Sequence, residues 1–230
     1  MKLEDEIKYV DKIFDNSISK NLKAIYNTIV PFGEVMTTNA QIAIDKFTKR
    51  KHKELLERIL SDNEIITTID VNDIEFIMNF KKTLYAVNKL SNNDKLIYFA
   101  NLLKNGYLKE NRILNDEYEE SLRILSQLSY RELNYVAFLY KFEQNNSSNK
   151  ENYWKKFICE FEKEFNINKF ETYEIYKRIS NLGLINEKVN IETNFNNEES
   201  ETLKIGDIET KYFYITEFFK KIIKLIELDK

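Results

Sequence analysis

The stretch "SYRELNYVAFLYKF", from Ser129 to Phe142, holds both a helix start and a helical apolar stripe. Glu132 follows Ser129 by three residues, the spacing of a capping box, in which each side chain bonds a free backbone N–H of the first turn. After this start, apolar side chains recur at helical spacing and therefore lie on one side of the helix. These core-facing residues are Leu133, Val136, Ala137 and Tyr140. The stretch therefore predicts a helix with one side packed in a core.

Four other segments begin with the same spacing of a polar cap and a polar partner, and the chain has only one Pro and four Gly in 230 residues. Since Pro and Gly are the usual breaks between short elements, a mostly helical fold is expected. The starts are Thr38 with Gln41, Asn72 with Glu75, Ser91 with Asp94, and Asn168 with Glu171. The predicted helices are 3–14, 18–29, 39–61, 72–90, 92–107, 115–127, 130–143, 150–165, 169–182 and 216–228.

A polar segment, "EQNNSSNK" (Glu143–Lys150), separates two parts of the chain. It lacks apolar residues and follows a complete helix, which is typical of a linker. We predict a helical bundle domain at 1–143, a linker at 144–150 and a second domain at 151–230. No internal repeat is evident, so the bundle is expected to be irregular.

Beyond Leu184, "LINEKVNIETNF" alternates apolar and polar residues, and "LKIGDIETKYFYI" follows after a polar interruption. Alternation predicts two strands. A helix, two strands and a closing helix are the element order of a winged helix, and Gly183 suits the left-handed residue that ends the first helix. The predicted fold is an irregular helical bundle followed by a winged-helix-like α+β module. A plain α/β appendage is the alternative.

Composition limits the classes of function. At 43% hydrophobic and 32% charged residues, the chain is too apolar to be disordered throughout. A net charge of -3 provides no global basic field for nucleic acid, so any such contact is local. The lone Cys159, the acidic N-terminus and the lack of about 20 uninterrupted apolar residues indicate a cytoplasmic protein without a membrane span.

The segment from Lys89 to Phe142 resembles the abortive-infection alpha proteins and related bacterial and prophage proteins. Their pattern "D-K-L-x-x-x-A-x-L-L" followed by "L-S-x-x-E-L" is matched by core positions and helix caps. The matching residues are Asp94, Lys95, Leu96, Ala100, Leu102 and Leu103, then Leu128, Ser129, Glu132 and Leu133. The resemblance covers about a quarter of the chain. It implies a bacterial or phage origin and a role in phage defence or exclusion, and it transfers no active-site residue.

A basic run, "KFTKRKHKELLERIL", places four cations on one predicted helix face: Lys46, Lys49, Arg50 and Lys53. Like charges at this spacing repel by roughly 0.2–0.5 kcal/mol per pair, so an anionic partner would relieve them. The partner is nucleic acid, a phosphate-bearing ligand or an acidic protein. The other interpretation is a solvated face balanced by Glu54 and Glu57.

No catalytic set is convincing. His52 is the only histidine and has no suitable neighbour in sequence, and Cys159 lies among aromatics, where a small buried side chain is expected. Asp70, Asp73 and Glu75 suit helix capping. No glycine-rich phosphate loop is present. Asp207, Glu209 and Lys211 alternate on a predicted strand, and a Mg²⁺-dependent nuclease using them is the third interpretation.

Two surfaces of the second domain are candidates for partner binding. In "FETYEIYKRISNLGL", Lys177 and Arg178 would approach DNA phosphates, but residues 168–230 contain ten Lys and Arg against twelve Asp and Glu. The acidic predicted wing, with Glu198, Glu199 and Glu201, favours a protein partner.

The last segment, "KYFYITEFFKKIIKLIELDK", combines a Thr216 cap with a wide apolar stripe. We expect it to close the second domain or to extend its apolar face to a partner chain, with a membrane-surface helix as a lesser alternative. Its candidate partner-binding residues are Phe218, Phe219, Ile222 and Ile226.

Taken together, these observations favour a non-enzymatic interaction or regulatory component, with a protein partner or a second copy of itself and without metal or cofactor. Nucleic-acid binding through the Lys46–Lys53 face or the Lys177/Arg178 helix is the first alternative. The nuclease is the second.

Overall fold

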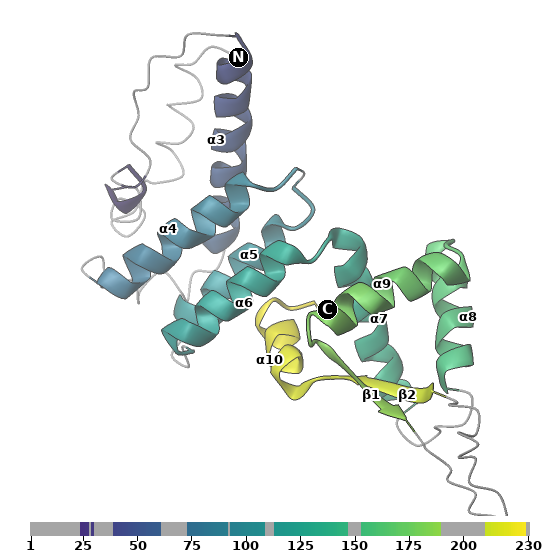
Figure 1. Cartoon of the computed structure of the whole chain (residues 1–230). Helices are drawn as coiled ribbons and strands as arrows, with labels where there is room; N and C mark the ends of the chain where they lie inside the picture. Colours follow the sequence, from purple (N-terminus) through teal and green to yellow (C-terminus); the bar gives the residue numbers. More distant parts are fainter. Residues whose placement is uncertain are drawn as a thin grey trace, which may run out of the picture. The chain divides into compact units, whose positions relative to one another are not determined.

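The computed structural model describes residues 24–27, 29, 39–60, 73–91, 93–108, 113–146, 153–189 and 210–228. Within these ranges the chain is mostly helical, with a two-stranded antiparallel sheet toward the C-terminal end (Figure 1). This confirms the predicted mostly α class with a small β element. The predicted helix 3–14 lies outside the described residues, and of the predicted helix 18–29, residues 24–27 and 29 are described as helical.

The chain forms two compact units. Unit 1 contains α3 (Asn39–Leu60), α4 (Ile74–Asn88), α5 (Leu96–Leu103), the π-helical η2 (Lys104–Leu108), α6 (Asn115–Gln127) and the last turn, Leu225–Leu228. Unit 2 contains α7 (Tyr130–Asn145), α8 (Tyr153–Phe165), α9 (Lys169–Asn181), β1 (Ile185–Val189), β2 (Thr210–Ile215) and most of α10 (Glu217–Leu225).

The units divide between Gln127 and Leu128, so α7 belongs to unit 2. The domain boundary predicted from the sequence lies after residue 143. The difference arises because α7 packs its aromatic side chains against α8, and helical period does not say which neighbour a stripe will meet. Most of the predicted linker, 147–150, lies outside the described residues, and the linker stays a prediction.

Polar caps begin several helices, as expected. At α7, Glu132 N–H donates to Ser129 Oγ at 3.2 Å and Ser129 N–H donates to Glu132 Oε2 at 2.6 Å, which is the predicted capping box. Asn168 Oδ1 accepts from Glu171 N–H at 3.0 Å at the start of α9. Both predictions are confirmed.

Two predicted starts are wrong. The cap of α4 is Asp73 in place of Asn72, because Asp73 Oδ1 accepts the N–H groups of Glu75 and Phe76 at 2.9 and 3.1 Å. Helix α5 begins at Leu96, after a turn and without a side-chain cap, so Ser91 does not start it. Asn72 itself and Thr38, the predicted cap of α3, lie outside the described residues.

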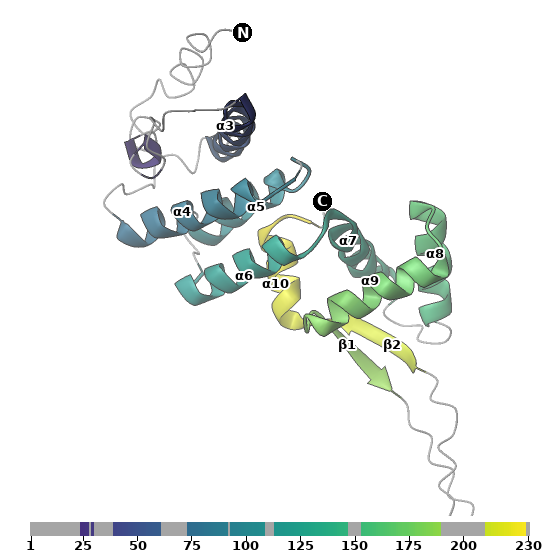
Figure 2. The same ribbon diagram turned by 45° about the horizontal axis from the view of Figure 1, so that its top comes forward.

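The sheet follows α9 through a left-handed turn at Gly183, whose φ is 71°. A residue with a side chain is strained there, so glycine is the favoured residue, as predicted. Ile185 pairs with Ile215 and Asn186 with Tyr214, and an irregularity falls between Lys188 and Val189. The sheet lies against α9 (Figure 2).

Each unit has its own core. In unit 1 the most deeply buried side chains come from α3, α4, α5 and α6, among them Leu55, Phe80, Phe99, Tyr118 and Leu125. In unit 2 the core is aromatic: ring centroids lie 5.0 Å apart for Tyr135 and Phe161 and 4.4 Å apart for Trp154 and Phe213. Of the stripe predicted for α7, Leu133 and Val136 are fully buried, while Ala137 and Tyr140 are half-buried.

Candidate interaction surface

Helices α8 and α9 are joined by a short turn, Asn166–Asn168. Asn166 has a φ of 50°, a left-handed conformation that asparagine adopts more readily than most residues. Asn168 then caps α9. The turn therefore fixes where α8 stops and where the first exposed residues of α9 begin.

Helix α9 has an inner side in the core and an outer side that is unusually aromatic. Thr172, Ile175, Tyr176 and Ile179 are buried. On the outer side Phe170 is 83% exposed and Tyr173 is 43% exposed. Lys177 continues the same line at i+4 from Tyr173. We call Phe170, Tyr173 and Lys177 the α9 face.

The charges around the α9 face are mixed. The ammonium of Lys177 lies 5.1 Å from the ring centroid of Tyr173, within cation–π range. Arg178 Nε lies 3.1 Å from Oε1 of the buried Glu132, so this guanidinium holds α9 to the start of α7. Glu171 and Glu174 are also exposed. Of the two predicted cations, Lys177 lies on the face and Arg178 is already paired.

Aromatic packing holds α9 in place from below. The Tyr176 ring lies 5.3 Å from Trp154 of α8 and 5.1 Å from Phe213 of β2, centroid to centroid. Tyr176 is buried beside Ile175, and Tyr173 lies three positions before it on the same helix. Packing of Tyr176 therefore also sets the direction in which Tyr173 and Phe170 leave the helix. The α9 face is thus presented by a helix whose inner side is packed against α8 and β2.

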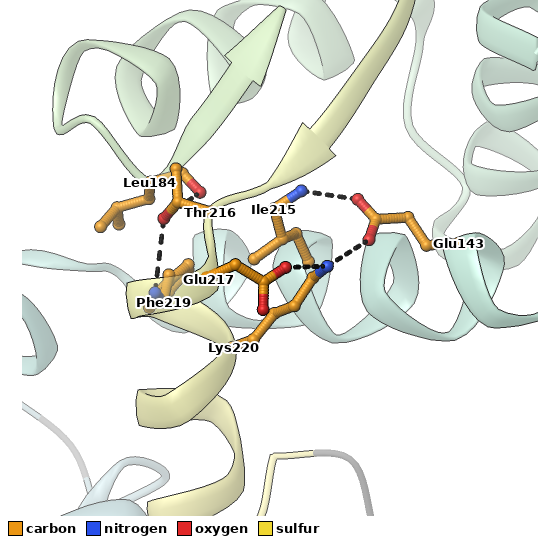
Figure 3. A network of polar contacts seen from close by, with 7 residues as sticks. All are labelled: Glu143, Leu184, Ile215, Thr216, Glu217, Phe219 and Lys220. Carbon is orange, nitrogen blue, oxygen red and sulfur yellow. Dashed lines mark hydrogen bonds and ion pairs between the residues drawn. The ribbon is translucent and has the colours of Figure 1, made fainter. Parts of the chain in front are cut away.

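A polar network ties α7 to the junction between β2 and α10 (Figure 3). The buried Glu143 accepts the backbone N–H of Ile215 on Oε1 at 2.6 Å, and its Oε2 lies 3.8 Å from Lys220 Nζ. Lys220 also donates to Glu217 at 2.8 Å. Because the Ile215 N–H points to α7, Glu143 satisfies a donor on the β2 edge away from β1.

Thr216 links the same junction to the end of α9. Its N–H and its hydroxyl donate to the Leu184 carbonyl at 3.0 and 3.3 Å, and its Oγ1 accepts from Phe219 N–H at 3.3 Å. This confirms the predicted cap of α10. Thr216 therefore connects the end of β2 and the start of α10 to the residue that follows the turn at Gly183.

The charged groups of this network shift one another's pKa values. Burial raises the pKa of Glu143 above its ordinary value, and the Ile215 N–H and Lys220 oppose this rise. The hydrogen bond from Lys220 lowers the pKa of the exposed Glu217, and the same bond raises the pKa of Lys220. At neutral pH the network holds a carboxylate that is costly to bury.

The predicted cationic face lies on α3 in unit 1. Lys46 and Arg50 are exposed, and Lys49 and Lys53 are half-buried. Lys53 Nζ lies 4.0 Å from Glu57 Oε1, and the Arg50 guanidinium lies 5.4 Å from the Phe47 ring centroid. The four cations share the helix, but Glu57 partly balances them.

Two functional-looking residues of α3 face inward. Lys51, 1% exposed, donates to the Leu90 carbonyl, and burial lowers its pKa. His52, also 1% exposed, has Nδ1 2.9 Å from the Tyr26 hydroxyl and Nε2 2.5 Å from Asn88 Oδ1. Neither partner is a Ser or Cys nucleophile or a carboxylate, so these contacts do not form the catalytic relay that the sequence also failed to indicate. The partners of His52 lie 26 and 36 positions away in the chain, where no local pattern could identify them.

Cys159 is exposed, contrary to the expectation of core packing. Helix α8 buries Tyr153, Phe157, Ile158 and Phe161, and Cys159 falls on the other side. In the C-terminal segment Phe219, Ile222 and Ile226 are at most 1% exposed and only Phe218 is half-buried. Three of the four predicted partner-binding residues thus pack inside the chain.

Asp207 and Glu209 of the proposed nuclease site lie outside the described residues, as do Asp70 and the predicted wing acids Glu198, Glu199 and Glu201. Lys211 belongs to β2. Among the residues that are described, no group of three His, Cys, Asp or Glu is placed to hold a metal ion. In the same part of the chain, no helix is long and apolar enough to cross a bilayer.

None of the family models, curated proteins or solved structures compared with the chain matches it.

Proposed function

We propose that this protein is a non-enzymatic interaction component whose unit 2 is a winged-helix-like module. The order α7, α8, α9, β1, β2, with a short turn between α8 and α9, supports this assignment. In such a module α9 is the helix offered to a partner. The single observation that carries the proposal is the exposed aromatic pair Phe170 and Tyr173 on that helix.

The α9 face has the properties of a binding hot spot. Aromatic side chains are enriched at protein interfaces, and tyrosine is among the residues that carry most of the binding energy. Covering the side chain of Phe170 would gain roughly 1.5–3 kcal/mol from its apolar surface. Tyr173 and Lys177 already contact each other at 5.1 Å, so little side-chain entropy is lost when a partner covers them.

Charge favours a protein partner over DNA. Glu171 and Glu174 are exposed on the same helix as Lys177, and Arg178 is paired with Glu132. DNA carries a charge roughly every 1.7 Å along its axis, and a helix that reads it presents net positive surface. A partner with an apolar pocket and nearby acidic residues suits this face better.

The proposed biological context is phage defence or exclusion in bacteria. It rests on the resemblance of residues 89–142 to the abortive-infection alpha proteins. The matched apolar residues Leu96, Ala100, Leu102 and Leu103 are completely buried, and Ser129 and Glu132 form the capping box. Their roles in core and cap support a similarity of scaffold.

A phage-plating experiment tests both the face and the context. Bacterial cells that produce the wild-type protein should plate a sensitive phage less efficiently than cells without it. Phe170→Ser together with Tyr173→Ser should restore plating and change the free energy of unfolding by less than about 0.5 kcal/mol per substitution, because both side chains lie at the surface. Tyr130→Ser, which alters a 40% exposed tyrosine of the same unit, is the matched control.

Three results would go against this proposal. If the double variant still reduces plating, the α9 face is not the contact. If wild-type protein leaves plating unchanged, the defence context is wrong. Salt-dependent retention on DNA or RNA that is lost when Lys46, Lys49, Arg50 and Lys53 are reversed would support nucleic-acid binding through α3 instead.

A further inference from the structure

Helix α4 of unit 1 is apolar on both of its sides. Its inner side packs into the core of the unit. The buried residues are Phe76, Asn79, Phe80, Thr83, Leu84, Ala86 and Val87. A helix that uses one side for its own core normally presents polar residues on the other, but the outer side of α4 departs from that rule.

The outer side carries three large apolar residues in one row. Ile74 is 73% exposed, Met78 is 48% exposed and Tyr85 is 64% exposed, with the exposed Lys81 between the last two. Positions i, i+4, i+7 and i+11 share one helix face. We call Ile74, Met78, Lys81 and Tyr85 the α4 stripe. An apolar row of this kind is typical of an interaction site.

The two ends of the stripe carry opposite charges. The exposed Glu75 lies at the N-terminal end beside Ile74. At the other end the Lys89 ammonium folds back over the Tyr85 ring, 4.4 Å from its centroid. A surface with an acid at one end and a cation at the other is complementary to its own copy when the copy is reversed.

We propose that the α4 stripe is a self-association surface, on which α4 pairs antiparallel with α4 of a second copy. Ile74 then packs against the partner's Tyr85, and Met78 against the partner's Lys81. The Lys89 ammonium, held over Tyr85, lies beside the partner's Glu75. A parallel pair would instead place the two Glu75 carboxylates together.

Neither helix geometry nor charge opposes the antiparallel register. In it, the two Lys81 residues are offset by three positions, about 4.5 Å along the axis, on helices about 8–10 Å apart. Their ammonium groups can therefore point apart into water. The opposite dipoles of the two helices also run side by side with their unlike ends together.

Analytical ultracentrifugation of the full chain tests the surface. Wild-type protein is expected to be dimeric at micromolar concentration. Met78→Lys sets a new cation against the partner's Lys81 and should raise the dimer dissociation constant by about 100-fold. Tyr130→Ser, at a site in unit 2 that is 40% exposed against 48% for Met78, should leave the dissociation constant unchanged. A monomeric wild type, or a dimer indifferent to Met78→Lys, would overturn the proposal.

Disulfide trapping tests the direction of the pair. In a Cys159→Ser background, a mixture of Ile74→Cys and Tyr85→Cys chains should oxidise to a covalent heterodimer, while either chain alone should remain mostly uncrosslinked. Homodimers from each single variant would indicate a parallel pair and contradict the antiparallel register. Charge reversal gives a second readout: Glu75→Lys and Lys89→Glu should each weaken the dimer, and the two combined in one chain should restore it.

Discussion

Glu143 joins α7 to a strand that follows it by 72 positions. Its carboxylate accepts the Ile215 N–H and lies near Lys220, so one side chain satisfies a strand-edge donor and fixes the start of α10. Burial of this carboxylate raises its pKa above the ordinary 4.5. At neutral pH, therefore, the ionised Glu143 holds β2 and α10 in place, but its burial lowers the free energy of unfolding.

The cost predicts a pH-dependent effect of Glu143→Gln. A folded-state pKa above the unfolded value means that the folded protein binds this proton more tightly. The free energy of unfolding then falls as pH rises through the window just above 4.5. Gln cannot ionise, and its amide oxygen can still accept from Ile215. The variant should match the wild type near pH 4 and become the more stable one toward about pH 7.

Urea unfolding across this pH range measures the difference. Glu143→Ala serves as the control, because it also cannot ionise but leaves the buried Ile215 N–H without its acceptor. It should therefore be about 1–3 kcal/mol less stable than Glu143→Gln at every pH. A Glu143→Gln variant that loses stability relative to wild type as pH rises would show that the Lys220 ion pair outweighs burial.

Residue environments were the least predictable from sequence. His52 obtains Tyr26 and Asn88 from distant segments, and Lys51 reaches the Leu90 carbonyl. Cys159 lies among aromatic residues in the sequence, yet the helical turn carries it to the solvent side. The contacts of His52 and Lys51 are tertiary, and a local pattern does not encode them. The exposure of Cys159 follows from helical phase, which composition alone does not show.

Helix boundaries were predicted well where the start signal is local and complete. The predicted helix 115–127 matches Asn115–Gln127, and Ser129 with Glu132 marks the start of α7. The start of α5 was misplaced because Ser91 has the right spacing but precedes a turn, after which α5 begins without a side-chain cap. The spacing alone does not guarantee that the backbone turns helical at once.

The capping box of α7 should have a measurable effect on stability. Ser129→Ala removes the acceptor for Glu132 N–H and should lower the free energy of unfolding by about 1 kcal/mol. Glu132 also holds Arg178, so Ser129→Ala in an Arg178→Ala background separates the cap from the ion pair. Chemical denaturation of the four proteins gives both terms. A Ser129→Ala change without loss of stability would mean that the box does not stabilise α7.

At the scale of the whole chain, helical class and the C-terminal strands were predictable, because few residues break helices and alternation marks β1 and β2. The grouping of α7 with unit 2 could not be predicted from the sequence. It depends on aromatic contacts, such as Phe138 with Phe161 at 5.4 Å, that join α7 to α8. The exposed α9 face could have been noticed from Phe170, which stands out of phase with the buried positions of its helix.

We propose that unit 2 contacts a protein through α9. Photo-crosslinking in living bacterial cells tests it most directly, with a benzophenone amino acid placed at position 170 and, as the matched control, at position 130. We expect one discrete protein adduct from position 170, absent from position 130 and lost when Tyr173→Ser and Lys177→Glu are added. Adducts to nucleic acid, or the same adducts from both positions, would contradict it.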